Sequence, residues 1–320
     1  MAQVVYSFPQ TEEFFKLIGV ESLLSTLDSP SFIYQNFDNS EIYAIQAEPE
    51  LIQLADEPEW DLLNSSYESS LNEDEYKSKL TILIDTLNAG ALEKLVFSRR
   101  QVLAKTIFSL SQLLLKMRNQ YPKAFIYALQ SENFGTWIGA SPEILIDGEN
   151  KNYRSVSLAG TKANDAGEWT DKEFEEQQIV TDYILEKLEN SGAKTIKYSE
   201  TEEISAGPVK HLKTNIDYQY EAELIELVNS LSPTPAVCGV PLNLAKEYIL
   251  NNENYNRQLY SGAVGFSDGD QAKIFVNLRC MQVAQEQVAL YVGGGITSKS
   301  DWQEEWRETE LKARTLLDLI

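Results

Sequence analysis

The feature that most constrains this fold is a series of short β-type segments, several of them separated by only a few residues. Segments rich in Val, Ile, Phe and Tyr occur at residues 94–99, 124–129, 136–146, 260–266, 273–283 and 288–296. The gaps between the last three are turn-like, with the sequences SDGDQ and AQEQ. Parallel neighbours would need crossovers of about a dozen residues or more, so these strands are expected to pair antiparallel.

Two long helical patterns interrupt the β-type segments. One begins at Thr170 and the other at Ser300, and each has apolar residues spaced i, i+3, i+4, i+7. This mixture predicts an α+β fold, an α/β sandwich in which large, mostly antiparallel sheets are flanked by helices. No internal repeat and no Pro/Gly/Ser-rich linker divides the sequence, so we expect a single domain over residues 1–320.

The charge of the chain limits its partners. Its 320 residues include 27 basic and 49 acidic side chains, a formal net charge of −22, which repels nucleic acid and anionic membrane surfaces. The sequence has no basic leader and no run of about 18 apolar residues, so we expect a soluble, cytoplasmic protein that binds neither nucleic acid nor membrane. An anionic substrate would need positive charge supplied locally by lysine, arginine, helix N-termini or a metal.

Cysteine and histidine are scarce in this chain. Cys238 and Cys280 are the only cysteines and form no CxxC motif, which argues against structural zinc and against a disulfide scaffold, so buried thiols are expected. His211 is the only histidine, and a Ser-His-Asp triad would depend on it alone. Carboxylates and lysines are therefore expected to carry most of any chemistry.

Each of the two predicted helices carries a pair of glutamates three residues apart, on one helix face. The pairs are Glu173 with Glu176 and Glu305 with Glu308. Residues at this spacing have Cβ atoms roughly 5–6 Å apart, so two ionised carboxylates repel each other unless a cation lies nearby. Mg²⁺ prefers such oxygen ligands. The alternative is a pair of solvated helix faces in an acidic chain, and Glu173 also completes a capping box with Thr170.

Two further candidate side chains lie at the ends of β-type segments. Glu143 follows Ser-Pro within GASPE and precedes an apolar run, and Lys94 begins the segment KLVFSR. Burial raises the pKa of a glutamate toward the value that suits a general acid, and lowers the pKa of a lysine toward the value that suits a base. The alternatives are a turn glutamate exposed to water and a solvated lysine at a strand end.

A glycine triplet and one arginine are candidates for binding an anion. Residues 293–295 are all glycine and precede the last helix, so they predict either a loop whose N–H groups receive an anion or a tight strand-to-helix turn. Arg279 lies inside the apolar segment 273–283, where an arginine is costly unless it meets a carboxylate. That carboxylate belongs either to a structural aspartate or to a bound acid.

These segments are part of a longer set of ordered motifs: KLVFSR, GASPE, LAGT, KEFEEQ, HLKT, SPTPAVCG, NRQLYSGAVG, NLRC, GGGI and EEWRET. With them the chain resembles the chorismate-utilising enzymes, a family that includes isochorismate synthase, salicylate synthase, anthranilate synthase component I and aminodeoxychorismate synthase component I. The resemblance covers residues 91–320. It implies the chorismate-binding enzyme fold for the whole chain, with residues 1–90 as a divergent N-terminal part of the same domain.

The resemblance implies catalytic and metal-binding roles. Members that use water as the nucleophile have a lysine where this chain has Lys94, whereas members that use ammonia have a glutamine. Lys94 would then be the general base that activates water for attack at C2 of chorismate, and Glu143 the general acid that protonates the departing C4 hydroxyl. The implied cofactor is Mg²⁺. Its ligands would be Glu176 and Glu305, and Glu173 and Glu308 would support them.

The resemblance also implies a substrate site. Arg279 and Tyr260 match positions that bind the carboxylate of the enolpyruvyl arm of chorismate. The backbone of Gly294 and Gly295 matches a segment that receives the ring carboxylate, and His211 is expected near the substrate without an assigned role. The other implied substrate-binding positions are Gly160 in LAGT and Ala236 in TPAVCG.

The function implied most directly is that of an isochorismate synthase, a Mg²⁺-dependent isomerase that converts chorismate reversibly to isochorismate. Ala236 supports it, because salicylate and anthranilate synthases tend to have threonine at this position and isochorismate synthases alanine. The alternatives are a salicylate synthase, which also eliminates pyruvate, and a silent scaffold or binding protein of the same fold. We expect a monomer without an amidotransferase subunit, whose product feeds either menaquinone or siderophore biosynthesis.

Overall fold

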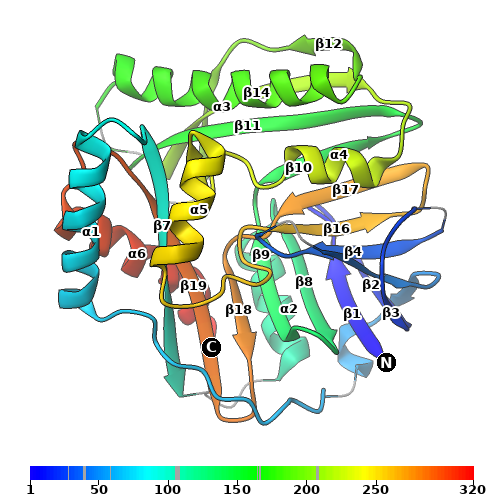
Figure 1. The fold of residues 1–320 in the computed structure, drawn as a ribbon. Helices are drawn as coiled ribbons and strands as arrows, with labels where there is room; N and C mark the ends of the chain where they lie inside the picture. Colours follow the sequence, from blue (N-terminus) through cyan, green and yellow to red (C-terminus); the bar gives the residue numbers. More distant parts are fainter. Residues whose placement is uncertain are drawn as a thin grey trace.

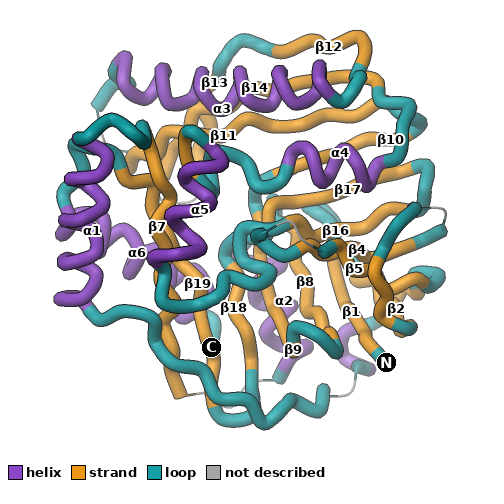
Figure 2. Tube along the Cα trace, viewed as in Figure 1, coloured by secondary structure: helices purple, strands orange, loops and turns teal. Residues whose placement is uncertain are grey.

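Two large antiparallel sheets form the centre of the molecule, and helices pack along them (Figures 1 and 2). The computed structural model describes residues 1–27, 29–38, 41–57, 59–104, 109–163, 165, 167–206 and 209–320. Every strand pair within these residues is antiparallel. The hairpins at SDGDQ and AQEQ form as expected, and they join β16 (Ala263–Ser267) to β17 (Gln271–Val276) and β18 (Cys280–Val283) to β19 (Gln287–Ile296). The predicted α+β fold is confirmed.

The first sheet has nine strands within the described residues. Their order is β15 (Gly239–Val240), β7 (Lys94–Ala104), β19 (Gln287–Ile296), β18 (Cys280–Val283), β9 (Gly135–Ser141), β8 (Phe125–Ser131), β1 (Ala2–Ser7), β2 (Phe14–Gly19) and β6 (Glu50–Ile52).

The second sheet has ten strands in the same described part of the chain. Their order is β12 (Lys194–Tyr198), β14 (Val209–Gln219), β11 (Asn152–Ala163), β10 (Ile144–Glu149), β17 (Gln271–Val276), β16 (Ala263–Ser267), β4 (Ser31–Gln35), β5 (Ile42–Gln46) and β3 (Glu21–Leu23), and β13 (Glu202–Ala206) also pairs with β14. Residues 1–90 thus contribute strands to both sheets.

The two helices predicted from the sequence start where it supplies caps. Thr170 and Glu173 form the expected capping box, and Asp301 accepts hydrogen bonds from the amides of Gln303 and Glu304. No described helix has the length and apolar character needed to cross a membrane. The helices are α1 (Glu73–Asn88), α2 (Leu110–Gln120), α3 (Asp171–Asn190), α4 (Leu224–Leu231), α5 (Leu242–Asn252) and α6 (Trp302–Leu317), with a 3-10 turn η1 (Leu54–Asp56).

An aromatic core fills the space between the two sheets. Phe125 of β8 stacks on Phe275 of β17, with ring centroids 4.6 Å apart, and Tyr6 of β1 packs on Phe32 of β4. Burial of such rings dominates core energetics. Cys238 and Cys280 are free, buried thiols, as predicted. The core therefore fixes one sheet against the other. The strands that carry the candidate residues are held in place as parts of these sheets.

One expected strand is in fact two. Residues 273–283 were predicted to be a single strand, but β17 ends at Val276, β18 begins at Cys280, and the two strands belong to different sheets. The link between them contains Arg279, whose φ is +48°. Arg279 is therefore a turn residue between sheets and not a strand residue, because a strand cannot accommodate this backbone conformation.

Candidate active site

Lys94 begins β7 between two neighbouring strands. Val240 of β15 pairs with it on one side, and β19 runs along the other side of the strand. Its side chain is only 12% exposed, and its ammonium forms an ion pair with Glu176 of α3. The solvated strand-end lysine is thus excluded, and the α3 carboxylate compensates the buried charge.

Residues 293–295 form neither a loop nor a turn, contrary to both expectations. All three lie within β19 and pair with residues 96–98 of β7. Their lack of a side chain leaves space for functional groups. A Cβ atom added to Gly295 would lie 2.9 Å from Cε of Lys94, and one added to Gly294 would lie 2.9 Å from Oε2 of Glu305. Glycine here lets a lysine and a carboxylate lie directly against the strand.

Glu143 occupies the break between β9 and β10. Its side chain is buried, at 7% exposure, so it is not a water-exposed turn glutamate. Desolvation raises the pKa of Glu143 to about 7, and the nearby charge of Lys94 opposes this rise. The two catalytic candidates from different strands are therefore close enough to influence each other electrostatically.

The four helix glutamates differ in their partners. Glu305 accepts a hydrogen bond from Ser300 Oγ at 2.7 Å, and Glu308 forms an ion pair with Lys312 at 2.7 Å. For Glu173, partial desolvation opposes ionisation, but hydrogen bonds from Thr170 and the ammonium of Lys162 outweigh it and lower the pKa. Glu176 is the partner of Lys94. Lysines thus balance three of these carboxylates.

These carboxylates fit a magnesium ion that takes few protein ligands. Glu305 and Glu308 lie beside Gly294, and Glu176 lies beside Gly295, the next residue of β19. No three side chains of His, Cys, Asp or Glu within the described ranges lie close enough together to share a metal ion. Mg²⁺ is usually held by one or two carboxylates and completes its shell with water and substrate oxygens, so a cage of four carboxylates is not required.

Arg279 and Tyr260 flank a pair of linked turns. Ser261 also has a positive φ, of +65°, and its amide donates to the carbonyl of Asn277 at 2.8 Å. No described carboxylate forms an ion pair with Arg279, although burial lowers the pKa of its guanidinium. Non-glycine residues at positive φ cost energy and concentrate at ligand-binding sites. The turns present a partly buried cation, and no carboxylate of the described residues pairs with it.

His211 lies close to three charged groups of this region. Burial lowers the pKa of its imidazole, the charges of Arg279 and Lys312 lower it further, and the charge of Glu308 raises it. Its Nδ1 lies 3.0 Å from the carbonyl oxygen of Gly160, which has a φ of +66° at the bulge in β11. The second sheet therefore contributes His211 to the region where α6 and Arg279 come together.

Ala236 and Tyr260 are two further positions predicted to bind substrate. Ala236 is half-buried in the segment between α4 and β15, two residues before Cys238, whose carbonyl accepts from the Val96 amide at 2.8 Å. Tyr260 is buried, and its ring stacks on Tyr291 of β19 with centroids 5.7 Å apart. Both positions thus adjoin the strand pair β7–β19.

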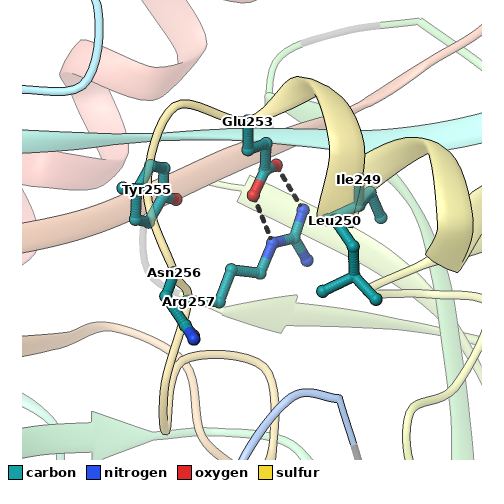
Figure 3. Close-up of a pocket in the computed structure, with 6 residues that line it drawn as sticks. All are labelled: Ile249, Leu250, Glu253, Tyr255, Asn256 and Arg257. Carbon is teal, nitrogen blue, oxygen red and sulfur yellow. Dashed lines mark hydrogen bonds and ion pairs between the residues drawn. The ribbon is translucent and has the colours of Figure 1, made fainter.

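A buried charge network along β7 was not predicted from the sequence. Figure 3 shows the side chains of Glu253 and Arg257 facing each other. Both residues line a cavity of about 200 Å³. Arg257 also donates to the carbonyls of Val96 and Val237, at 2.7 and 3.0 Å, and Glu253 accepts from the Ser98 amide at 2.8 Å. The network holds β7 in place. The i, i+4 spacing of the pair is the only sequence feature that could have indicated it.

Lys312 was also missed. It donates to the carbonyl of Gly293 at 2.8 Å while paired with Glu308, so it adds a cation at the glycine segment of β19. Its i, i+4 spacing from Glu308 on the last helix could have indicated this position.

The chain is similar in sequence to known isochorismate synthases. Isochorismate synthase MenF of Escherichia coli K12 is 31% identical over 252 residues, covering 73% of this chain and 58% of that protein. Isochorismate synthase EntC of the same strain is 28% identical over 244 residues, covering 72% of this chain and 62% of that protein. The chain thus matches less than two thirds of the length of either relative.

The fold of this chain is similar to the folds of solved structures. The menaquinone-specific isochorismate synthase MenF of Escherichia coli matches with a TM-score of 0.87 at 20% identity, over 100% of this chain and 88% of that one. Anthranilate synthase component I of Streptococcus pneumoniae matches with a TM-score of 0.75 at 16% identity, over 98% and 89% of the two chains. The model of the family described as chorismate binding enzyme matches residues 32–320. The chain therefore belongs to the chorismate binding enzyme family.

Proposed function

We propose that this protein is an isochorismate synthase, which converts chorismate reversibly to isochorismate. The observation that carries the proposal is the burial of Glu143, whose pKa desolvation raises to about 7 against the opposing charge of the largely buried Lys94. A largely buried base and a buried acid suit a reaction in which one water adds and another leaves. The isochorismate synthases among the relatives support the same reaction.

In the proposed reaction, Lys94 is the general base that accepts a proton from the water that attacks C2 of chorismate. Glu143 gives its proton to the C4 hydroxyl, which departs as water while the ring double bonds shift. The reverse reaction exchanges the two roles. The low exposure of both side chains excludes competing bulk water and strengthens their electrostatic effects.

Binding of chorismate, a dianion, requires cations against the net charge of −22. A Mg²⁺ ion would be held by Glu176 and Glu305, with Glu173 and Glu308 in support, and when bound it supplies positive charge for the ring carboxylate. Arg279 binds the carboxylate of the enolpyruvyl arm, since its guanidinium has no carboxylate partner among the described residues.

The other residues shape the substrate site. Tyr260 lies beside the Arg279 turn, His211 and Gly160 close the site from the second sheet, and the small side chain of Ala236 leaves space near β7. The product serves either menaquinone or siderophore biosynthesis. Relatives include a menaquinone-specific enzyme and a vibriobactin-specific enzyme.

The test is incubation of the purified protein with chorismate, with and without Mg²⁺, followed by chromatographic separation of the products. Isochorismate formed only with Mg²⁺ is the expected result. Salicylate together with pyruvate would instead identify a salicylate synthase. Chorismate left unchanged under both conditions would overturn the enzymatic proposal and favour a binding protein of the same fold.

A further inference from the structure

Asn277 lies one residue beyond the paired part of the hairpin formed by β16 and β17, and it is completely buried, at 0% exposure. Its backbone amide donates to the carbonyl of Gly262 at 2.7 Å, and its carbonyl accepts from the amide of Ser261 at 2.8 Å. The backbone of Asn277 thus extends the hairpin by one step, up to the turn that contains Tyr260 and Ser261.

The side chain of Asn277 has two buried partners. Its Nδ2 donates to the carbonyl of Leu259 at 2.9 Å, and its Oδ1 accepts from the hydroxyl of Tyr127 at 2.7 Å. A carbonyl oxygen can only accept, so the NH₂ group must face Leu259 and the oxygen must face Tyr127. Aspartate would have no donor for Leu259, and an apolar side chain would satisfy neither partner. The amide group therefore has one orientation, in which it joins the chain just before Tyr260 to β8.

Tyr127 in turn lies against β9, the strand next to β8. Its ring covers Gly139, because a Cβ atom added there would lie 2.5 Å from Cε1 of Tyr127. The residue after Gly139 is Ala140, whose amide donates to the carbonyl of Arg279 at 3.1 Å. The strand pair β8–β9 therefore holds both the Asn277 side chain and the backbone of Arg279.

The two turns need such support. Arg279 has a φ of +48° and Ser261 a φ of +65°, and backbone conformations of this kind persist in non-glycine residues only when the surrounding structure holds them. Asn277 precedes Arg279 by two residues, and it bonds on both sides of Tyr260, to Leu259 and to Ser261. The same buried residue thus contacts the first turn and leads directly into the second.

We propose that Asn277 is a positioning residue for substrate binding: its side-chain amide, held by the Tyr127 hydroxyl, fixes the Tyr260 turn relative to the Arg279 turn. Asn277 acts through these two residues and does not itself touch the substrate. This inference rests on the proposed function, in which Arg279 binds the carboxylate of the enolpyruvyl arm. A fixed separation of the two turns lowers the ordering cost of binding that carboxylate.

The first test compares KM for chorismate in the parent, Tyr127→Phe and Tyr218→Phe. Asn277→Ala would leave two buried groups without partners and risks unfolding the chain, so Tyr127→Phe, which keeps the ring, is the primary variant. Tyr218→Phe is the matched control, because it removes a buried hydroxyl that lies 3.0 Å from Ser155 Oγ in the pairing of β11 with β14. We expect Tyr127→Phe to raise KM roughly 2- to 10-fold, the factor that corresponds to one hydrogen bond, with kcat within about 2-fold. Tyr218→Phe should change neither constant, although its melting temperature should fall by a similar amount.

The double variant Tyr127→Phe/Arg279→Gln tests whether the effect passes through the arginine. Mutations that act on one interaction are not additive. We therefore expect Tyr127→Phe to raise KM less in the Arg279→Gln background than in the parent. Equal factors in the two backgrounds would contradict a positioning role toward Arg279.

Hydrogen–deuterium exchange of the protein without ligand tests the positioning apart from catalysis. Peptides that contain residues 259–262 and 277–279 should exchange faster in Tyr127→Phe than in the parent or in Tyr218→Phe, because the amides of Ser261 and Asn277 lose support. Unchanged exchange, or an unchanged KM in Tyr127→Phe while the parent converts chorismate, would overturn this inference and leave the proposed function intact. A parent that leaves chorismate unchanged would overturn the proposed function, and the inference with it.

Discussion

The Lys94 ammonium and the Glu176 carboxylate form an ion pair that joins the first residue of β7 to the first turns of α3. One partner is the proposed base and the other a proposed magnesium ligand, so the two functions meet in a single contact. The absence of a side chain at Gly295 leaves room for it. The pair gives the first prediction.

Lys94→Ala should abolish turnover without unfolding the chain. Loss of a general base lowers kcat by about 100- to 10,000-fold, whereas Glu176 can be solvated once its partner is removed. Chromatographic assay of isochorismate and a thermal melt measure the two effects. Lys151→Ala is the matched control, because Lys151 is 58% exposed and pairs with Glu221 on the surface. Full activity in Lys94→Ala would exclude this lysine as the base.

Gly295→Ala should impair catalysis by displacing Lys94. The added Cβ would lie 2.9 Å from Lys94 Cε, closer than real Cβ contacts allow, so the lysine must move. We expect at least a 10-fold loss of kcat, since small misplacements of reacting groups are costly, with normal secondary structure by circular dichroism. Gly167→Ala, where an added Cβ meets nothing within 4 Å, is the control. Equal kcat values in the two variants would contradict the close packing.

Local sequence features predicted the elements and several site residues, but not their spatial relationships. Helix caps at Thr170 and Asp301 depend on neighbouring residues, so α3 and α6 could be placed from sequence. The turn at Arg279 could not, because apolar residues continue through it and only the split between two sheets breaks the strand. The glycines of β19 likewise looked like a turn until their pairing with β7 was known.

The functional contacts depend on long-range packing. Glu143 could be proposed as an acid from its apolar neighbours, but its burial and the effect of the Lys94 charge on it depend on the folded sheet, in which β19 and β18 lie between β7 and β9. Tyr76 lies in the first 90 residues, where no motif was recognised. Its ring packs on Trp306 only because α1 packs against α6, which no local sequence pattern encodes.

Glu143 should make both activity and stability depend on pH. Its pKa is raised from 4.5 to about 7 in the folded protein. Below pH 4.5 it is protonated in the folded and unfolded states; as pH rises toward 7 only the unfolded state ionises, so stability falls. The loss amounts to roughly 3 kcal/mol for a shift of this size.

Glu143→Gln should remove this pH dependence. Urea denaturation of parent and variant between pH 4 and 8 isolates the contribution of Glu143, because other groups titrate in both proteins. The kcat/KM of the parent should decrease above pH 7, where the acid is ionised, and the variant should lose about 100- to 10,000-fold in kcat. Parallel stability curves for the two proteins would show that the carboxyl pKa is not raised.

The buried Glu253–Arg257 pair should be the most sensitive ion pair for stability. Both side chains are 1% exposed, and their hydrogen bonds hold β7 at Val96 and Ser98. Arg257→Met leaves Glu253 buried without its partner, which costs about 3–5 kcal/mol, measured by urea denaturation. Lys273→Met, which breaks an exposed pair with Asp147, should cost at most about 1 kcal/mol. Similar losses for the two variants would contradict the role of the buried pair.

Arg279→Gln should separate substrate binding from folding. Because no described carboxylate pairs with this partly buried guanidinium, removing its charge relieves a desolvation cost, and the free protein should be at least as stable as the parent. A charged hydrogen bond to a substrate carboxylate contributes about 1.5–3 kcal/mol, so KM for chorismate should rise about 10- to 100-fold with a smaller change in kcat. Arg154→Gln, which alters an exposed pair with Asp217, should change neither the stability nor the KM.

An unchanged KM for Arg279→Gln would remove Arg279 from the substrate site. A lower melting temperature of the free variant would instead mean that the protein itself compensates this charge, because only a guanidinium with favourable internal contacts stabilises the unliganded fold.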